Sequence, residues 1–111
     1  MDCIFCKIIS KEIPSKLIHE DEWSIAFPDI NPQAPTHLLI VPKQHIAKMA
    51  ESHPEDTALL GHLLSMARQI SSKSKLNDYR IVINNGSEAG QTVWHLHLHL
   101  LSGRPFAWPP G

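Results

Sequence analysis

The sequence has 111 residues and a formal net charge of −1, with 42% hydrophobic and 19% charged residues. These values fit a single globular domain, 1–111, that can bury a core, and they argue against a disordered chain. No basic run alternates with aromatic residues, which argues against nucleic-acid binding, and no apolar stretch approaches the roughly 20 residues that cross a membrane.

The cysteine count and the N-terminal residues suggest an intracellular protein. The chain has 2 cysteines and 8 histidines, whereas a small secreted domain held by disulfides would use more cysteines. Met1-Asp2-Cys3 shows no basic segment ahead of an apolar one, so no signal peptide is expected. We therefore expect a cytoplasmic location.

The N-terminal part is expected to form a short helix and two short strands. Apolar side chains in residues 4–9 recur at helical spacing and predict a helix that ends near Lys11. Residues 18–27 predict two strand pieces around a charged turn at 19–22. The prolines between residues 28 and 36 predict a loop.

A strand and the one long helix are expected next. Residues 37–41 predict an apolar strand that Pro42 ends. Residues 43–49 are expected to form a loop with a turn of helix. Ser52 is predicted to cap a helix that runs to about Ser74, because leucines then follow at helical spacing.

Two strands and a tail complete the chain. Residues 80–84 are rich in β-branched side chains and predict a strand, which a polar, glycine-containing loop at 85–92 connects to a second strand at 93–101. Residues 104–111 are expected to be extended. The whole pattern predicts an α+β fold with a mostly antiparallel sheet and one principal helix.

The last strand carries the most informative pattern in the sequence, since residues 95–101 read His-Leu-His-Leu-His-Leu-Leu. Alternate side chains of a strand share a face, so His95, His97 and His99 are expected in a row about 6–7 Å apart, with the leucines facing a core. Threonine, lysine or glutamate would serve better on a merely solvated face. Three aligned histidines therefore indicate catalysis or metal binding.

The loop before this strand favours binding of a phosphate ester. It contains Gly86, Gly90, Gln91 and Thr92. Glycines allow backbone N–H groups to converge on an anion, and the Thr92 hydroxyl adds a donor. A neutral imidazole beside such a site can attack phosphorus while the donors neutralise phosphoryl charge.

Metal binding is the competing interpretation. Two histidines of the row could ligate a catalytic zinc and leave one coordination position open for water. Cys3-x-x-Cys6 is half of a tetrahedral zinc site, for which His45 and His95 are the natural further ligands. Alternatively, Cys3 and Cys6 are two small core residues, and the residues alone leave this choice open.

The segment His95 to Leu101 matches the pattern His-φ-His-φ-His-φ-φ, where φ is apolar, and the sequence thereby resembles the histidine triad (HIT) superfamily. Further matching stretches resemble its Hint branch, the histidine triad nucleotide-binding proteins, and they cover nearly the whole chain. These stretches are Ile4-Phe5, Lys11-Glu12-Ile13-Pro14, Phe27 to Thr36, Pro42-Lys43, Leu60-Gly61-His62-Leu63, Gly90-Gln91-Thr92-Val93 and Trp108-Pro109-Pro110-Gly111.

This resemblance implies a fold and an activity. It implies a single HIT domain with a five-stranded antiparallel sheet, one main helix and a short N-terminal helix, and a homodimer that joins two sheets into one of ten strands. It implies hydrolysis of purine nucleoside phosphoramidates and aminoacyl adenylates, that is, of AMP or GMP conjugates. His97 resembles the nucleophile, which would become transiently nucleotidylated.

The resemblance also implies roles for other residues. His99, Thr92 and the N–H groups of Gly90 to Thr92 would hold the phosphoryl oxygens, and Asp29 would accept hydrogen bonds from the ribose hydroxyls. Asn84 and Gln91 match further nucleotide contacts, and Trp108 resembles a residue that reaches the partner subunit's site. The residues matching the apolar slot around the purine are Ile4, Phe5, Ile8, Phe27 and Ile30.

Relatives that carry the cysteine pair bind zinc with two cysteines and two histidines, which implies a structural zinc on Cys3, Cys6, His45 and His95. Such a site would remove His95 from direct catalysis. Three alternatives to the phosphoramidase remain. They are a nucleotide-binding adaptor with incidental hydrolysis, a dinucleoside polyphosphate hydrolase, and a zinc hydrolase that uses the histidine row.

Overall fold

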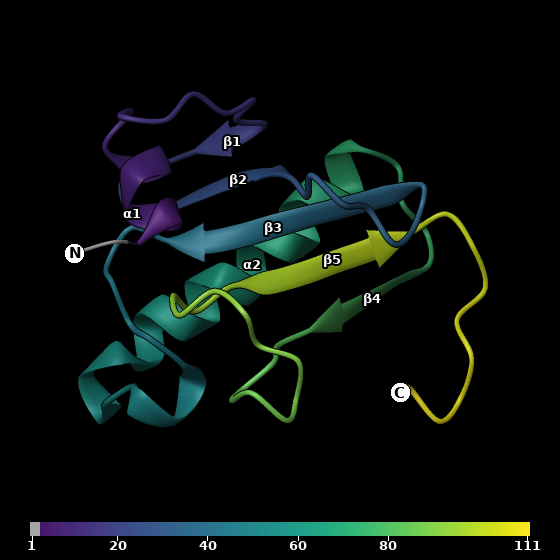
Figure 1. The fold of residues 1–111 in the computed structure, drawn as a ribbon. Helices are drawn as coiled ribbons and strands as arrows, with labels where there is room; N and C mark the ends of the chain where they lie inside the picture. The colour runs from purple at the N-terminus through teal and green to yellow at the C-terminus, as the bar shows by residue number, and fades with distance from the viewer. Residues whose placement is uncertain (1–2) are drawn as a thin grey trace.

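The computed structural model describes residues 3–111 and shows a five-stranded antiparallel sheet between two helical layers (Figure 1). The strand order is β1-β2-β3-β5-β4. The elements are α1 (Ile4–Ile9), β1 (His19–Glu20), β2 (Ser24–Pro28), β3 (Thr36–Pro42), α2 (Thr57–Lys73), β4 (Tyr79–Val82) and β5 (Leu98–Ser102), with 3₁₀ turns at Met49–Glu51 and Pro54–Asp56. The predicted α+β fold is confirmed.

Met1 and Asp2, part of the stretch in which no signal peptide is expected, lie outside the described residues. Within residues 3–111, no helix is both long and apolar enough to cross a membrane.

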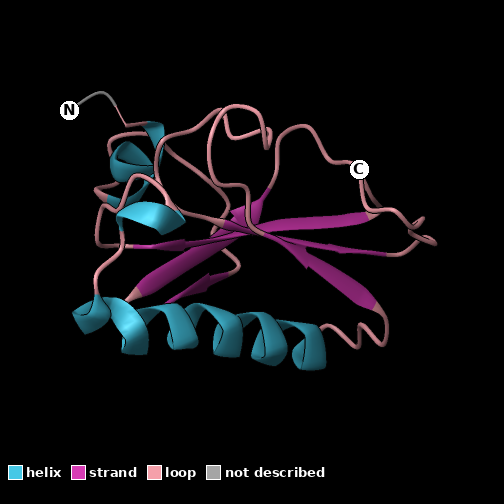
Figure 2. Ribbon diagram, turned by 90° about the horizontal axis from the view of Figure 1, so that it is seen from below, coloured by secondary structure: helices cyan, strands magenta, loops and turns pink. Residues whose placement is uncertain are grey.

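The two faces of the sheet bury two separate apolar clusters. Figure 2 shows α2 alone along one side of the sheet and α1 on the other. Leu96, Leu98 and Leu100 are each at most 1% exposed and pack in the cluster under α2, as their alternation predicts. The opposite cluster, beneath α1, is formed by Cys3, Phe5, Ile8, Ile25, Phe27, Leu39 and Val41. The histidines between the leucines therefore face the α1 side.

The histidine strand is shorter than predicted. Strand β5 begins only at Leu98, which pairs with Ile40, so His95 and His97 lie in a lead-in segment that bends at residues 93–95. The lead-in leaves the sheet because the Leu96 N–H donates to the carbonyl of Ile46 (2.7 Å) in the loop after β3. For the same reason β4 ends at Val82, the residue paired with His99, and does not reach Asn84.

The predicted cap of the long helix is wrong. The Ser52 hydroxyl donates to the Met49 carbonyl (2.7 Å) and so belongs to the preceding 3₁₀ turn. The N-terminal end of the helical segment is capped instead by Asp56, whose carboxylate accepts from the His53 N–H (2.9 Å). A 3₁₀ turn at Pro54–Asp56 then leads into α2.

The charged turn near the N-terminus is also displaced. His19 and Glu20 form β1 themselves, and the turn lies at residues 21–23. Asp21 organises it by accepting hydrogen bonds from the ring of His19 (2.8 Å) and from the ring of His62 on α2 (2.9 Å). Two of the eight histidines thus fix this turn and lie outside the row: His19 joins it to β1, and His62 joins it to the long helix.

Candidate active site and metal centre

Four sulfur and nitrogen donors from three separate parts of the chain meet at one end of the sheet. Cys3 caps α1 and Cys6 lies in its first turn, His45 follows β3, and His95 precedes β5. All four donor atoms lie within 4.8 Å of one another. The separations are 3.3 Å for Cys3 Sγ–His95 Nδ1, 3.4 Å for Cys6 Sγ–His45 Nδ1, 3.6 Å for Cys6 Sγ–His95 Nδ1 and 3.1 Å for His45 Nδ1–His95 Nδ1.

These separations fit a tetrahedral ion. Ordinary Zn–S and Zn–N bond lengths give tetrahedron edges of about 3.3 Å between two nitrogens and about 3.6 Å between nitrogen and sulfur. Because a carbonyl only accepts, the contact of His95 Nε2 with the Pro42 carbonyl (2.8 Å) places the ring proton on Nε2. Burial, together with the neighbouring His45 and His97, lowers the pKa of His95 to about 4, against the opposing hydrogen bond to Pro42. Nδ1 of His95 therefore presents a free lone pair to the cluster.

The next histidine of the row has its own fixed tautomer. Nδ1 of His97 lies 2.7 Å from the carbonyl of His95, to which it must donate. In the neutral ring this leaves Nε2 without a proton and with an available lone pair. His97 is 8% exposed, so its ring is held inside the site.

A buried histidine outside the triad fixes the tautomer of the third one. The Gln33 N–H donates to Nδ1 of His37 (3.0 Å), so His37 carries its proton on Nε2. That Nε2 lies 2.8 Å from Nδ1 of His99 and donates to it. His99 must then carry its own proton on Nε2. The ring centroids of His97 and His99 are 5.0 Å apart, so a ring with a bare nitrogen and a ring with an N–H donor are neighbours.

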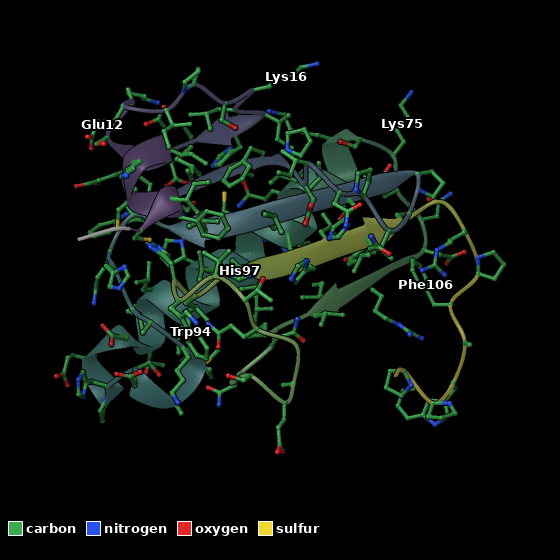
Figure 3. All side chains as sticks on the ribbon, viewed as in Figure 1. Glu12, Lys16, Lys75, Trp94, His97 and Phe106 are labelled. Carbon is green, nitrogen blue, oxygen red and sulfur yellow. The ribbon has the colours of Figure 1, made fainter. Side chains whose placement is uncertain are left out.

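Helix α1 packs against this row. The ring of Phe5 meets His97 edge-on at 5.1 Å, and it also contacts His95 at 5.9 Å and Phe27 at 5.6 Å. Figure 3 labels His97 in front of the sheet, close to the start of β5. The row is therefore held between the sheet and the short N-terminal helix.

Comparison with known proteins identifies the family. The family model described as HIT domain matches residues 10–106. The chain belongs to the HIT family. An uncharacterized HIT-like protein of Synechocystis is 54% identical over 111 residues, which cover 99% of this chain and 97% of that protein. A maize protein named 14 kDa zinc-binding protein is 52% identical over 114 residues, covering 97% of this chain and 87% of that protein.

Solved HIT structures have the same architecture. The crystal structure of a HIT family hydrolase from Legionella pneumophila has a TM-score of 0.96 and 48% identity, covering 99% of this chain and 100% of that one. A histidine triad protein from Clostridium difficile has a TM-score of 0.93 and 38% identity, covering 96% and 95% of the two chains. The expected HIT-like fold is thereby confirmed.

The acidic residue expected to contact ribose in this HIT chain lies at the other end of the row from the cysteines. Asp29 Oδ2 is 3.5 Å from Nε2 of His37, and its Oδ1 accepts from the Asn31 N–H (2.8 Å). Ile30 beside it is fully exposed. The structure therefore arranges Asp29, His37, His99 and His97 in one continuous line.

The glycine loop differs from its predicted role. The N–H groups of Gly90 and Gln91 donate to carbonyls of the same loop (3.0 and 3.1 Å) and are not free for an anion. The Gln91 side chain is buried and bonds to Gly86, Ala47 and Val93, so it closes the loop and does not face the row. Of this loop's predicted donors, only the N–H and hydroxyl of Thr92 lack a partner among residues 3–111.

Of the remaining residues predicted to contact the nucleotide, some are buried near the row, and others are exposed elsewhere. Phe5, Ile8 and Phe27 are buried together beneath α1, and Asn84 adjoins Gly90 from the end of β4, since a Cβ at Gly90 would lie 3.9 Å from Asn84 Nδ2. Ile4 is 47% exposed and lines a different hollow with Val93 and Trp94, so it does not join the others in a purine slot. Trp108 is 83% exposed in the C-terminal tail.

Sequence reasoning missed His37. Its signal is a histidine at the start of an otherwise apolar strand, Thr36–Pro42. The contact of His37 with His99 depends on how β3 pairs with β5. Leu39 is opposite His99, and His37, two residues before Leu39, lies on the same face of the sheet. A local pattern does not specify that register, so the contact could not be deduced from spacing.

The imidazoles of His37, which is buried, and of His99, which is partly buried, predict acid lability. Burial, with the nearby His97 and His37, lowers the pKa of His99 from 6.5 to about 4, and burial also lowers the pKa of His37 against the opposing charge of Asp29. Folded His99 binds a proton more weakly than His99 in the unfolded chain does. Its contribution to the free energy of unfolding is therefore fully present above about pH 6.5 and is lost as pH falls toward 4.

The test compares urea unfolding of the native protein and of His99→Gln at about pH 7.5 and about pH 5. We expect the native protein to lose about 1–2 kcal/mol more than the variant between these pH values. The metal ligands are the same in both proteins and cancel in the comparison. Equal losses would show that His99 does not titrate below its ordinary range.

Proposed function

We propose that this protein is a hydrolase of the Hint branch that cleaves the P–N bond of purine nucleoside 5′-phosphoramidates and also cleaves aminoacyl adenylates. The observation that supports it most is the pairing of a bare Nε2 on His97 with an N–H on Nε2 of His99. One is a nucleophile and the other a hydrogen-bond donor for phosphoryl oxygens. The Legionella relative is described as a hydrolase, which agrees with this proposal.

In the first step, the lone pair of His97 Nε2 attacks the α-phosphorus. The P–N bond to the amine breaks, and the amine leaves with the bonding electron pair and takes a proton from water. Nε2 of His97 is then bonded to phosphorus while Nδ1 keeps its proton, so the ring carries a positive charge. The carbonyl of His95 stabilises this charge by accepting from the Nδ1–H (2.7 Å). In the second step, water attacks phosphorus and the P–Nε2 bond breaks, with its electron pair returning to the ring. The proton lost by this water neutralises the hydroxide left by the first step, and the nucleoside monophosphate and neutral His97 are released.

Neutral His99 acts in these steps by hydrogen bonding. It donates its Nε2–H to a phosphoryl oxygen, while its Nδ1 accepts from His37 (2.8 Å). It is not the acid that protonates the amine, since losing its proton would make it an anion next to the phosphoryl group. The free hydroxyl and N–H of Thr92 supply further donors.

The nucleoside would lie between Asp29 and α1. The Asp29 carboxylate accepts hydrogen bonds from the ribose hydroxyls, which is a good way to recognise a cis-diol. Phe5, Ile8 and Phe27 form the apolar floor for the purine, and the fully exposed side chain of Ile30 covers it. Gly90 approaches from the glycine loop, and Asn84 approaches from the segment after β4.

His97→Asn is expected to bind nucleotide but to hydrolyse adenosine phosphoramidate several orders of magnitude more slowly, because it lacks the nucleophile. Rapid quenching and peptide mapping of the native enzyme should find the nucleotide on the peptide that contains His97. His19→Asn is the matched control, since that ring contacts only the structural carboxylate of Asp21 and turnover should be retained. More than about a tenth of native turnover in His97→Asn would contradict the nucleophilic mechanism.

We also propose that the four-residue cluster binds a structural zinc. The name of the maize relative and the donor separations support this proposal. With four protein ligands, a tetrahedral ion has no position for water, which argues against a zinc hydrolase. The ion would supply no step of the chemistry and would attach α1 and the loop after β3 to the lead-in of β5.

Metal analysis of protein purified without chelator should find about one zinc per chain. Cys3→Ser combined with Cys6→Ser should remove most of it and lower the free energy of unfolding by several kcal/mol, because metal binding is coupled to folding. His53→Ala is the control histidine, since His53 lies outside both clusters of candidate ligands, and it should retain the ion. Full zinc content in the double variant would contradict the assignment.

A homodimer is proposed from two exposed features. Strand β4 is at the edge of the sheet, and within the described chain no strand covers its outer side. Trp108 projects from a tail that Arg80 holds by donating to the Ala107 carbonyl (3.1 Å), and its indole is 83% exposed. A large exposed indole on a fixed tail suits contact with a second copy. Sedimentation showing only monomer at micromolar concentration would contradict this proposal.

A further inference from the structure

A hollow lies beside the four-residue cluster of Cys3, Cys6, His45 and His95, and the steps above assign no substrate group to it. It has a volume of about 390 Å³ and is lined by Cys3, Ile4, His45, Ala47, Thr92, Val93 and Trp94. Ile4 is 47% exposed and Trp94 is 43% exposed, so two large apolar side chains are presented to solvent at its surface. The nucleoside site does not account for this exposure, because Ile4 lies apart from the apolar cluster proposed to hold the purine.

The position of the hollow along the row is informative. Side-chain contacts lead from Asp29 through His37 and His99 to His97. From His97, the backbone followed toward the N-terminus leads to Trp94 and Thr92. Figure 3 labels Trp94 and His97 close together on the same side of the molecule, at the end of the row where β5 begins. The hollow therefore lies beyond His97 on the side away from Asp29.

The covalent order of the proposed substrate matches this geometry. A nucleoside phosphoramidate runs from ribose to phosphorus to the leaving amine. If ribose is at Asp29 and phosphorus is at His97, then the amine extends past His97, and Thr92 stands at the border between the phosphoryl group and the hollow. The amine substituent would then contact Ile4, Val93 and Trp94.

Resting on the proposed function, we infer that this hollow is a subsite for the leaving group and selects amines with an aromatic or branched apolar body. Among residues 3–111 no acidic side chain lines it, so a cationic substituent gains no partner from these residues. Lys48 Nζ lies 6.0 Å from the centroid of the Trp94 ring, which helps to hold the indole in place. An aromatic substituent can pack on this indole edge-to-face or in an offset stack.

The test uses two AMP phosphoramidates whose leaving groups have similar basicity, one with 2-phenylethylamine and one with ethylamine. Selectivity is the ratio of their kcat/KM values. Native protein should prefer the phenylethylamine compound, and Trp94→Ala should reduce the ratio by about 3–10-fold, mainly through KM. Hydrolysis of the ethylamine compound should stay near its native rate, since that substituent barely reaches the indole.

Trp23→Ala is the matched control, because Trp23 is 54% exposed and lines a different pocket, beside the first turn of α2. Its selectivity ratio should equal that of the native protein. Ile4→Ala provides a second probe of the hollow that is independent of the indole, and it should also lower the ratio.

The outcomes separate the two levels of the proposal. Hydrolysis of both compounds with a ratio that neither Trp94→Ala nor Ile4→Ala changes would overturn the subsite and leave the phosphoramidase standing. Failure of the native protein to hydrolyse either compound would overturn the proposed function and the subsite with it. A lowered ratio in both variants, with Trp23→Ala unchanged, supports the subsite.

Discussion

Each histidine of the row has one ring nitrogen committed to a fixed partner, and that commitment decides what the other nitrogen can do. His95 donates through Nε2 to the Pro42 carbonyl and turns Nδ1 to the metal cluster. His97 donates through Nδ1 to the His95 carbonyl and keeps Nε2 bare. His99 accepts at Nδ1 from His37 and keeps a proton on Nε2. Three identical side chains are thereby suited to the three roles proposed for them: ligand, nucleophile and donor.

These hydrogen bonds depend on a backbone that leaves the sheet. Because the lead-in to β5 bends away and the Leu96 N–H bonds to Ile46, the carbonyl of His95 is free to accept from the ring two residues later. The cluster of Cys3, Cys6, His45 and His95 fixes the same segment from the other side and brings α1 with it. Phe5 on α1 then closes over His97 at 5.1 Å. The candidate metal site and the histidine row are thus two ends of one packed assembly.

The sequence predicts which side chains share a face, and it does so well. The alternation of histidine and leucine predicts that Leu96, Leu98 and Leu100 are buried in the core, and the cysteine pair with His45 and His95 predicts the cluster that the structure assembles. The leucine positions follow from local alternation, which a linear pattern records, whereas the residues alone leave the role of the cysteine pair open and the resemblance supplies the full ligand set.

Partners distant in sequence are not recorded in the same way. The strand over 93–101 is predicted too long because the competing bond to Ile46 is not visible in the local alternation. Gln91 resembles a nucleotide contact, yet its amide is fully used in closing its own loop. His37 acquires its role from strand register and from one backbone N–H at Gln33. In each case a specific hydrogen bond that the local spacing does not record decides the role of the residue.

The most direct test of this account is the tautomeric state of the row in the intact protein. Nitrogen-15 NMR of the labelled protein near neutral pH distinguishes protonated from bare imidazole nitrogens, with signals assigned by His97→Asn and His99→Gln. We predict a proton on Nδ1 and a bare Nε2 for His97, and the reverse for His99. A proton on Nε2 of His97 would contradict the account, because the proposed nucleophile would then have no free lone pair.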